Sequence, residues 1–193
     1  ICSTPGVVAH AYQRWLKTQG ISHPQLSHDL DGWLIGIREL HASRAPGRTC
    51  LAALRDMKSF SDRASNQSKG CGGVMRVAPV GMFEASATQP GARGSSGHSA
   101  FQLGCETAAI THGHPTGILA SGLFANIISQ LLQGASLHDA IEHGMGLLRQ
   151  HPQHEETERI VRRACELAAN LPDPNTLPDE LGEGWIAEEA LAL

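Results

Sequence analysis

SKGCGGVMRVAPVG, residues 68–81, is the most informative stretch of the chain. Gly70, Gly72 and Gly73 precede an apolar segment that contains a single cation, Arg76. Glycines ahead of a helix let the backbone approach a ligand closely and leave N–H groups free to bind an anion. The same pattern suits a tight turn between two helices, so both interpretations stay open. A Walker loop or dinucleotide fingerprint is not matched, because the turn-like residues 65–67 precede the stretch in place of a buried strand.

The remaining sequence has the apolar spacing of helices, with no strand-like alternation. Gly20 is expected to stop the first helix, and Pro79 to kink or restart the third. Residues 21–30 are expected to form a loop, and residues 84–97 a mobile surface loop. The sequence therefore predicts an all-α fold, a compact orthogonal helical bundle. The predicted helices cover residues 7–19, 49–57, 73–84, 99–111, 116–133, 137–150, 155–170 and 185–193.

Length and composition narrow the class of protein. The 193 residues fit one domain, 1–193. A net charge of −4, with no basic cluster beyond the pair Arg162-Arg163, argues against a nucleic-acid partner. The five cysteines are dispersed, with no Cys-x-x-Cys spacing and no signal peptide, which predicts reduced thiols in a cytoplasmic protein.

The segment 116–133 is apolar for about the length of a short membrane span. Asn126, Ser129 and Gln130 interrupt it, and Gly134 ends it. A helix buried at the centre of an α-helical domain explains this pattern better than a span does. We therefore expect no membrane contact.

A second motif, AAITHGHPTG at residues 108–117, follows the glycine-rich stretch. Together the two motifs resemble the ADP-ribosylglycohydrolase family, which includes the bacterial enzyme that reactivates ADP-ribosylated dinitrogenase reductase. In that family a Gly-rich segment ending in Met-Arg-x-Ala-Pro is followed by a helix that closes on Thr-His. Residues 11–16, 40–54 with their Arg-Ala-Pro-Gly, and 182–191 also resemble bacterial members, so the likeness runs from Ala11 to the last residue.

The resemblance implies an all-α fold and hydrolysis of the glycosidic bond between ADP-ribose and a modified protein side chain or small molecule. ADP-ribose or an ADP-ribosylated protein is the implied partner. The residues that match the family loop around the pyrophosphate and distal ribose are Ser68, Lys69, Gly70, Cys71 and Gly72, and His112 matches a position that approaches the substrate. A helix-capping role for His112 explains its position equally well. Cys71 stands where relatives often carry Asn, and a role as nucleophile is a minor alternative.

The family's two acidic metal motifs, which serve Mg²⁺, have no counterpart here. The chain has no Asp-Asp pair, and its only Asp-x-Asp is Asp29-Leu30-Asp31. Magnesium prefers carboxylate oxygens, so we expect no metal to be bound by this chain and assign no catalytic residue. The chain is expected to be a truncated member that lacks terminal parts of the family bundle. The alternative to a hydrolase is a non-catalytic remnant that binds ADP-ribose or acts as an oligomeric interaction protein.

Two further expectations concern packing. Absent terminal helices would expose apolar surface around Val7, Leu16 and Leu191, so a homodimer or higher oligomer is expected. Arg76 lies among valines, and a carboxylate inside the domain is its expected partner.

Overall fold

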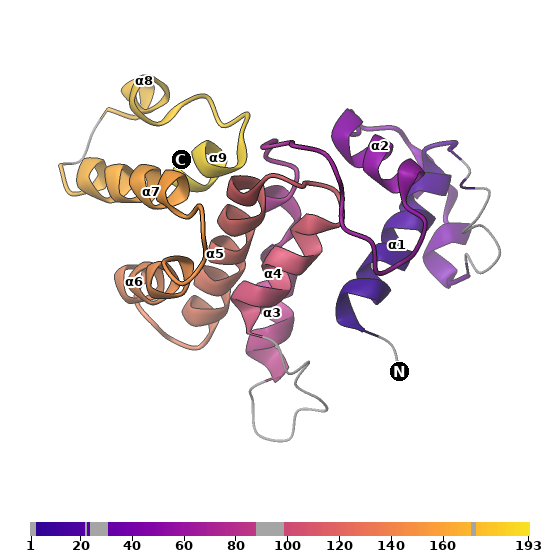
Figure 1. The fold of residues 1–193 in the computed structure, drawn as a ribbon, viewed down its shortest axis with the longest axis horizontal. Coiled ribbons are helices and arrows are strands. Elements are labelled where there is room, and N and C mark those ends of the chain that lie inside the picture. The colour runs from indigo at the N-terminus through magenta and orange to yellow at the C-terminus, as the bar shows by residue number, and fades with distance from the viewer. Residues whose placement is uncertain (1–2, 22, 24–30, 88–98, 171–172) are drawn as a thin grey trace.

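Helix α5 (Pro115–Leu132) runs through the centre of the fold and several helices pack around it, while the N-terminal helices lie to one side (Figure 1). The computed structural model describes residues 3–21, 23, 31–87, 99–170 and 173–193. These residues contain helices and turns but no strand, which confirms the all-α prediction. The remaining helices are α1 (Thr4–Thr18), α2 (Arg48–Asp56), α3 (Ala78–Ala87), α4 (Ala100–Ala109), α6 (Leu137–Leu148), α7 (Glu155–Ala168), α8 (Leu177–Leu181) and α9 (Ala187–Ala192), with short 3-10 helices η1 (Trp33–Gly36), η2 (Arg38–His41), η3 (Val74–Arg76) and η4 (Pro174–Thr176).

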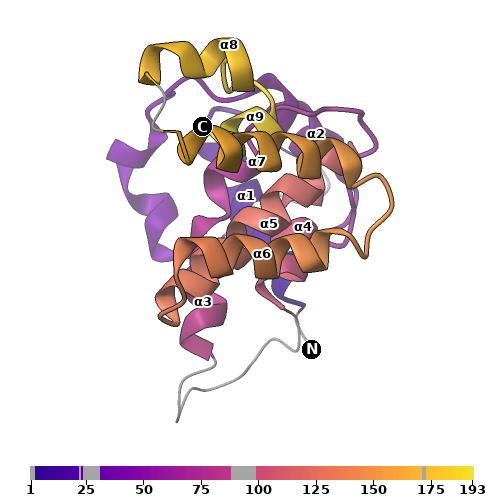
Figure 2. The same cartoon turned by 90° about the vertical axis from the view of Figure 1, so that its left-hand side faces the viewer.

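The main core forms where α4, α6 and α7 meet α5. Phe101, Leu123, Met145 and Leu148 are its largest buried side chains. In Figure 2, α6 and α7 lie one above the other and cross α5, the crossed arrangement expected of an orthogonal bundle. Along α5, 61% of the residues are buried inside the protein, as expected for a central helix that is long and apolar enough to resemble a span.

A second core lies on the N-terminal side, where α1 packs on α2. Leu16, Leu54 and Ile110 belong to this core. Leu16 is fully buried, so the expectation of exposed apolar surface around it was wrong, whereas Val7 is 52% exposed. Ser3 caps α1 by accepting a hydrogen bond from the Gly6 amide, and the chain leaves the helix at Gly20, whose φ of 77° suits glycine.

The third helix restarts near Pro79, as the sequence predicts. The glycine-rich stretch leads into η3, and α3 begins at Ala78 with Pro79 in its first turn, where a missing N–H costs nothing. Helix α3 continues to Ala87, so residues 85–87, which were predicted to be in a loop, are helical. Most of that predicted loop, and the predicted loop around residues 24–30, lies outside the described residues. The 3-10 turns at 33–41 were not predicted.

Candidate functional site

A cavity of about 680 Å³ opens between α1, α2 and the glycine-rich loop. Four of the predicted binding residues, Gly70, Cys71, Gly72 and His112, line it, while Ser68 and Lys69 lie behind the loop. The volume is that of a typical small-molecule site. The other lining residues are Tyr12, Trp15, Ala45, Gly47, Thr49, Cys50, Leu54, Met75, Arg76, Thr111 and Trp185.

The loop is held from behind by the segment that leads into α9. The Cys71 amide donates to the Trp185 carbonyl at 3.1 Å, and the Ala187 amide donates to the Lys69 carbonyl at 2.8 Å. This pair of bonds forms an isolated antiparallel bridge between Gly70 and Ile186. The amides of Gly72 and Gly73 have no protein acceptor among the described residues. Of these two residues only Gly72 lines the cavity, so the loop offers the Gly72 amide as a donor there.

His112 lies directly under the loop and is only 2% exposed. A Cβ added at Gly72 would lie 3.1 Å from His112 Cε1, and one added at Gly70 would lie 3.5 Å from His112 Nε2. A side chain at Gly72 would therefore crowd the imidazole ring, whereas one at Gly70 would only touch it at ordinary van der Waals distance. The Gly-rich motif and the Thr-His motif therefore pack directly against each other in the fold.

The imidazole of His112 is held neutral and in one tautomer. Its Nδ1 lies 2.8 Å from Thr111 Oγ1, and Arg76 Nη2 donates to the same hydroxyl oxygen. A guanidinium only donates, so Nδ1 is the acceptor available for the Thr111 proton, and Nε2 then carries the ring proton. Burial, and then the Arg76 guanidinium, lower the pKa of His112 to about 4. At neutral pH, His112 therefore offers an N–H donor without a charge.

Arg76 connects the loop to three helices. Its Nη1 donates to Cys50 Sγ at 3.4 Å, and Nη2 also donates to the Thr107 carbonyl at 3.4 Å. The guanidinium carbon lies 4.8 Å from the centroid of the Tyr12 ring, a cation–π contact. No carboxylate pairs with Arg76 in the described part of the chain, and its buried Nε lacks a partner. The expected internal ion pair was therefore wrong, and the cation is available to an anionic ligand.

Lys69 turns away from the cavity. Its Nζ lies 2.5 Å from carboxylate oxygens of both Glu156 and Glu188, and Glu156 also accepts from the Thr116 hydroxyl at 2.6 Å. Burial alone would lower the pKa of Lys69, but the hydrogen bonds and charges of the two carboxylates raise it. Lys69 therefore ties the loop to α7 and α9.

Ser68 also acts on the loop itself. Its hydroxyl accepts from the Gly70 amide at 3.2 Å and lies 3.4 Å from the Thr49 hydroxyl. Cys71 lines the cavity, and its thiol donates to Met75 Sδ at 3.5 Å. The predicted binding set thus divides into cavity residues and residues that shape the loop.

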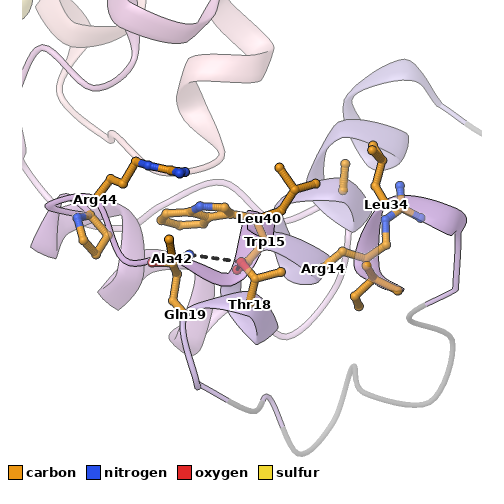
Figure 3. A pocket seen from close by; sticks show the side chains of 11 residues that line it. Arg14, Trp15, Thr18, Gln19, Leu34, Leu40, Ala42 and Arg44 are labelled. Carbon is orange, nitrogen blue, oxygen red and sulfur yellow. Dashed lines mark hydrogen bonds between the residues drawn. The ribbon is translucent and has the colours of Figure 1, made fainter. Parts of the chain in front are cut away.

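A neighbouring pocket of about 380 Å³ shares Trp15 with the main cavity. Figure 3 shows the Trp15 indole in its middle, with Arg44 on one side and Arg14 on the other. Arg14 pairs with the exposed Asp31 at 3.6 Å, whereas Arg44 pairs with no described carboxylate. The two pockets meet at Trp15, and Arg14, Arg44 and Arg76 are among the residues that line them.

The donors described do not fit a magnesium ion. Within residues 3–21, 23, 31–87, 99–170 and 173–193, no three His, Cys, Asp or Glu side chains gather to hold a metal. Glu156 and Glu188 are both engaged by Lys69, and Asp29 lies outside the described residues.

Sequence reasoning missed the roles of Tyr12, Cys50 and Arg76 in this site. Cys50 lies in the first turn of α2, just after the segment 44–47 that carries part of the family resemblance, so that segment was the available signal. In the sequence, Tyr12 is recognisable only as one residue of the apolar face of the first helix. Its pKa is raised by burial, and the Arg76 guanidinium offsets part of that rise.

Comparison with known proteins adds one result. The family model described as ADP-ribosylglycohydrolase matches residues 2–193. Curated proteins and solved structures gave no significant match.

Proposed function

Because the chain belongs to the ADP-ribosylglycohydrolase family, we propose that its main cavity binds the ADP-ribose group of a modified protein side chain or small molecule for hydrolysis of the glycosidic bond. The observation that carries this proposal is the packing of the Gly70–Gly72 backbone on His112, beside the guanidinium of Arg76, which has no carboxylate partner in the described part of the chain. Nearly the whole chain matches the family, and the cavity contains both motifs on which the resemblance rests.

The diphosphate is the part of the ligand that these residues suit best. Arg76 supplies a positive charge without a protein carboxylate, and the amide of Gly72 supplies a neutral donor nearby. Such fixed donors in a partly dry cavity bind an anion more strongly than the same groups do in water.

The ribose is the natural partner of His112 and the aromatic residues. Nε2–H of the neutral imidazole can donate to a ribose hydroxyl beneath the loop, and Tyr12 and Trp15 offer apolar ring surface. Trp185 is 75% exposed at the rim, with its Nε1 donating to Glu183 at 2.9 Å, and can close over a ligand from outside. The modified side chain would then leave past Trp15 toward Arg44.

The chemical step breaks the bond between the anomeric carbon and the nitrogen or oxygen of the acceptor, through an oxocarbenium-like transition state. Water supplies the hydroxyl to that carbon, and the leaving group takes a proton. Positioning by the loop and exclusion of water by the ring residues would lower the barrier. None of the residues lining the cavity is Asp or Glu, so the role of acid or base is assigned to no described residue.

Calorimetric titration of ADP-ribose, with excess magnesium and again with a chelator, tests the proposal. Saturable binding that Arg76→Gln weakens and Arg55→Gln leaves unchanged supports it, because Arg55 lies on the exposed face of α2. No binding in either condition contradicts the proposed site. Release of ADP-ribose from ADP-ribosyl-arginine or ADP-ribosyl-serine peptides then separates a hydrolase from a protein that only recognises the ligand.

A further inference from the structure

A second cavity, here called the α1–α3 groove, borders Arg76, as the main cavity does. Its volume is about 570 Å³. Apolar side chains from α1, α3 and α4 make most of its walls, and Arg76 and Tyr12 also line the main cavity. The residues that line the groove are Thr4, Val7, Val8, Tyr12, Arg76, Pro79, Val80, Phe83, Leu103 and Thr107.

The groove has a polar end and an apolar end. Tyr12, Val8 and Thr4 follow one another at turns of α1 on one face, over about 12 Å. On α4, Leu103 lies one turn before Thr107, and on the α3 side Phe83 lies beyond Arg76. Arg76, Tyr12 and Thr107 therefore gather at one end.

Two buried donors at the polar end lack partners. Thr107 is 1% exposed, and its Oγ1 makes no hydrogen bond within the described residues. The Nε of Arg76 is likewise buried and unpartnered. Leaving such groups unsatisfied costs free energy, which a bound acceptor would recover.

At the other end, apolar side chains are exposed to solvent. Val7 is 52% exposed and Phe83 is 48% exposed. Apolar surface of this kind favours burial against an aliphatic chain.

We propose that the α1–α3 groove binds an amphipathic carboxylate, such as a medium-chain fatty acid, with its carboxylate at Thr107 and Arg76 and its alkyl chain along Val8, Val80 and Phe83. Because no described carboxylate neutralises the Arg76 guanidinium, the groove is expected to bind an anion more tightly than a neutral alcohol. The length of the α1 face matches an extended chain such as that of decanoate. This inference is independent of the reaction at the main cavity.

The groove and the substrate cavity share Arg76 and Tyr12, so their ligands are coupled. A carboxylate beside Arg76 neutralises the charge that offsets the raised pKa of Tyr12. Binding of a carboxylate in the groove is therefore expected to raise the pKa of Tyr12 further. It is also expected to lower the affinity of the main cavity for an anionic ligand.

The test is calorimetric titration of the whole chain with decanoate below its micelle concentration, and with decanol. Decanoate is expected to bind one to one and decanol about tenfold more weakly. Thr107→Val removes the orphan hydroxyl without changing shape, and Phe83→Ala removes apolar wall; each is expected to weaken decanoate binding about tenfold. Met82→Ala is the matched control, because Met82 is 53% exposed on the same helix and does not line the groove.

Absence of saturable decanoate binding overturns the proposal. So does equal binding of decanol, or unchanged binding in both groove variants. A third contrary result is a dimer in sedimentation that Phe83→Asp converts to a monomer while decanoate fails to bind, because the groove would then be a self-association face. Folding of each variant is checked by circular dichroism, and Thr107→Val is expected to fold at least as stably as the parent.

Discussion

Tyr12 and Arg76 form a cation–π pair, with the guanidinium carbon 4.8 Å from the ring centroid. Tyr12 is the only tyrosine of the chain. Its phenol therefore reports, without interference from another tyrosine, on the guanidinium that borders both cavities.

Arg76→Gln is predicted to raise the pKa of Tyr12, because it removes the nearby charge that opposes the effect of burial. The same change is expected to weaken ADP-ribose binding by ~10- to 100-fold. Ultraviolet absorbance of the phenolate against pH measures the first effect, and calorimetry the second. Arg76→Lys separates charge from geometry: it should largely restore the titration of Tyr12 and restore binding only in part. A titration unchanged in Arg76→Gln would contradict the pair.

Gly72→Ala is predicted to reduce the free energy of unfolding by about 1 kcal/mol, because the new Cβ would crowd His112 Cε1 at 3.1 Å and Cys50 Sγ at 3.4 Å. Ligand affinity should fall as the loop moves off the imidazole. Gly146→Ala is the control, since its Cβ would meet nothing within 4 Å on α6 and should stabilise the helix by up to about 1 kcal/mol. Urea unfolding measures both, and equal effects of the two changes would refute the close packing.

Stability is predicted to fall as the pH is lowered from about 6.5 toward 4, partly through His112. Its pKa is lowered to about 4 in the folded state, so the unfolded chain takes up the proton first and each step of acidification favours unfolding. The contribution is fully present above pH 6.5, and the full shift sets an upper bound of about 3 kcal/mol. Urea unfolding of the parent and His112→Asn should show a shallower pH dependence in the variant. Parallel curves would mean that His112 is not held neutral by the fold.

Lys69→Met is predicted to lower the free energy of unfolding by about 3 kcal/mol, because it leaves the carboxylate of Glu188, 3% exposed, without its partner. Arg163→Met breaks a surface pair with Glu180 and should reduce stability much less than Lys69→Met does, because solvent screens an exposed pair. Thermal or urea unfolding compares the two. If Lys69→Met leaves stability unchanged but abolishes ADP-ribose binding, Lys69 contacts the ligand directly.

Alkylation by iodoacetamide is predicted to label Cys50 and Cys71 more slowly when ADP-ribose is present, because both line the main cavity. Cys165 is exposed and should react at the same rate with and without the ligand. Cys105 should stay unlabelled in the folded protein, since burial raises its pKa to about 12. Peptide mass spectrometry gives the rate at each site. Equal labelling of Cys50 and Cys71 in both conditions would place the ligand elsewhere.

The sequence predicted the features that depend on local pattern. Gly20 ends α1, Pro79 opens α3, and the Gly-rich and Thr-His motifs meet as their resemblance to one family implied. The first two depend on backbone chemistry that a few consecutive residues decide, and the third on the resemblance.

The remaining features depend on which distant residues the packing brings together. Arg76 meets Tyr12 and Thr111 only because η3 is placed between α1 and the end of α4, so its expected carboxylate partner was wrong. Lys69 forms an ion pair with Glu188, which is far away in the sequence, and no periodicity of the sequence reveals such a pair. The turns at η1 and η2 were missed because they bury no side chain and so show no apolar spacing.

The bridge between Gly70 and Ile186 also orders events during synthesis. A nascent chain can form α1 to α6 while translation continues, since those helices precede α7, α8 and α9 along the polypeptide. The ligand loop, however, gains its backbone partners only once Trp185 and Ala187 have left the ribosome. The cavity is therefore completed only after Trp185 and Ala187 have been synthesised, and earlier intermediates contain the loop without these two backbone hydrogen bonds.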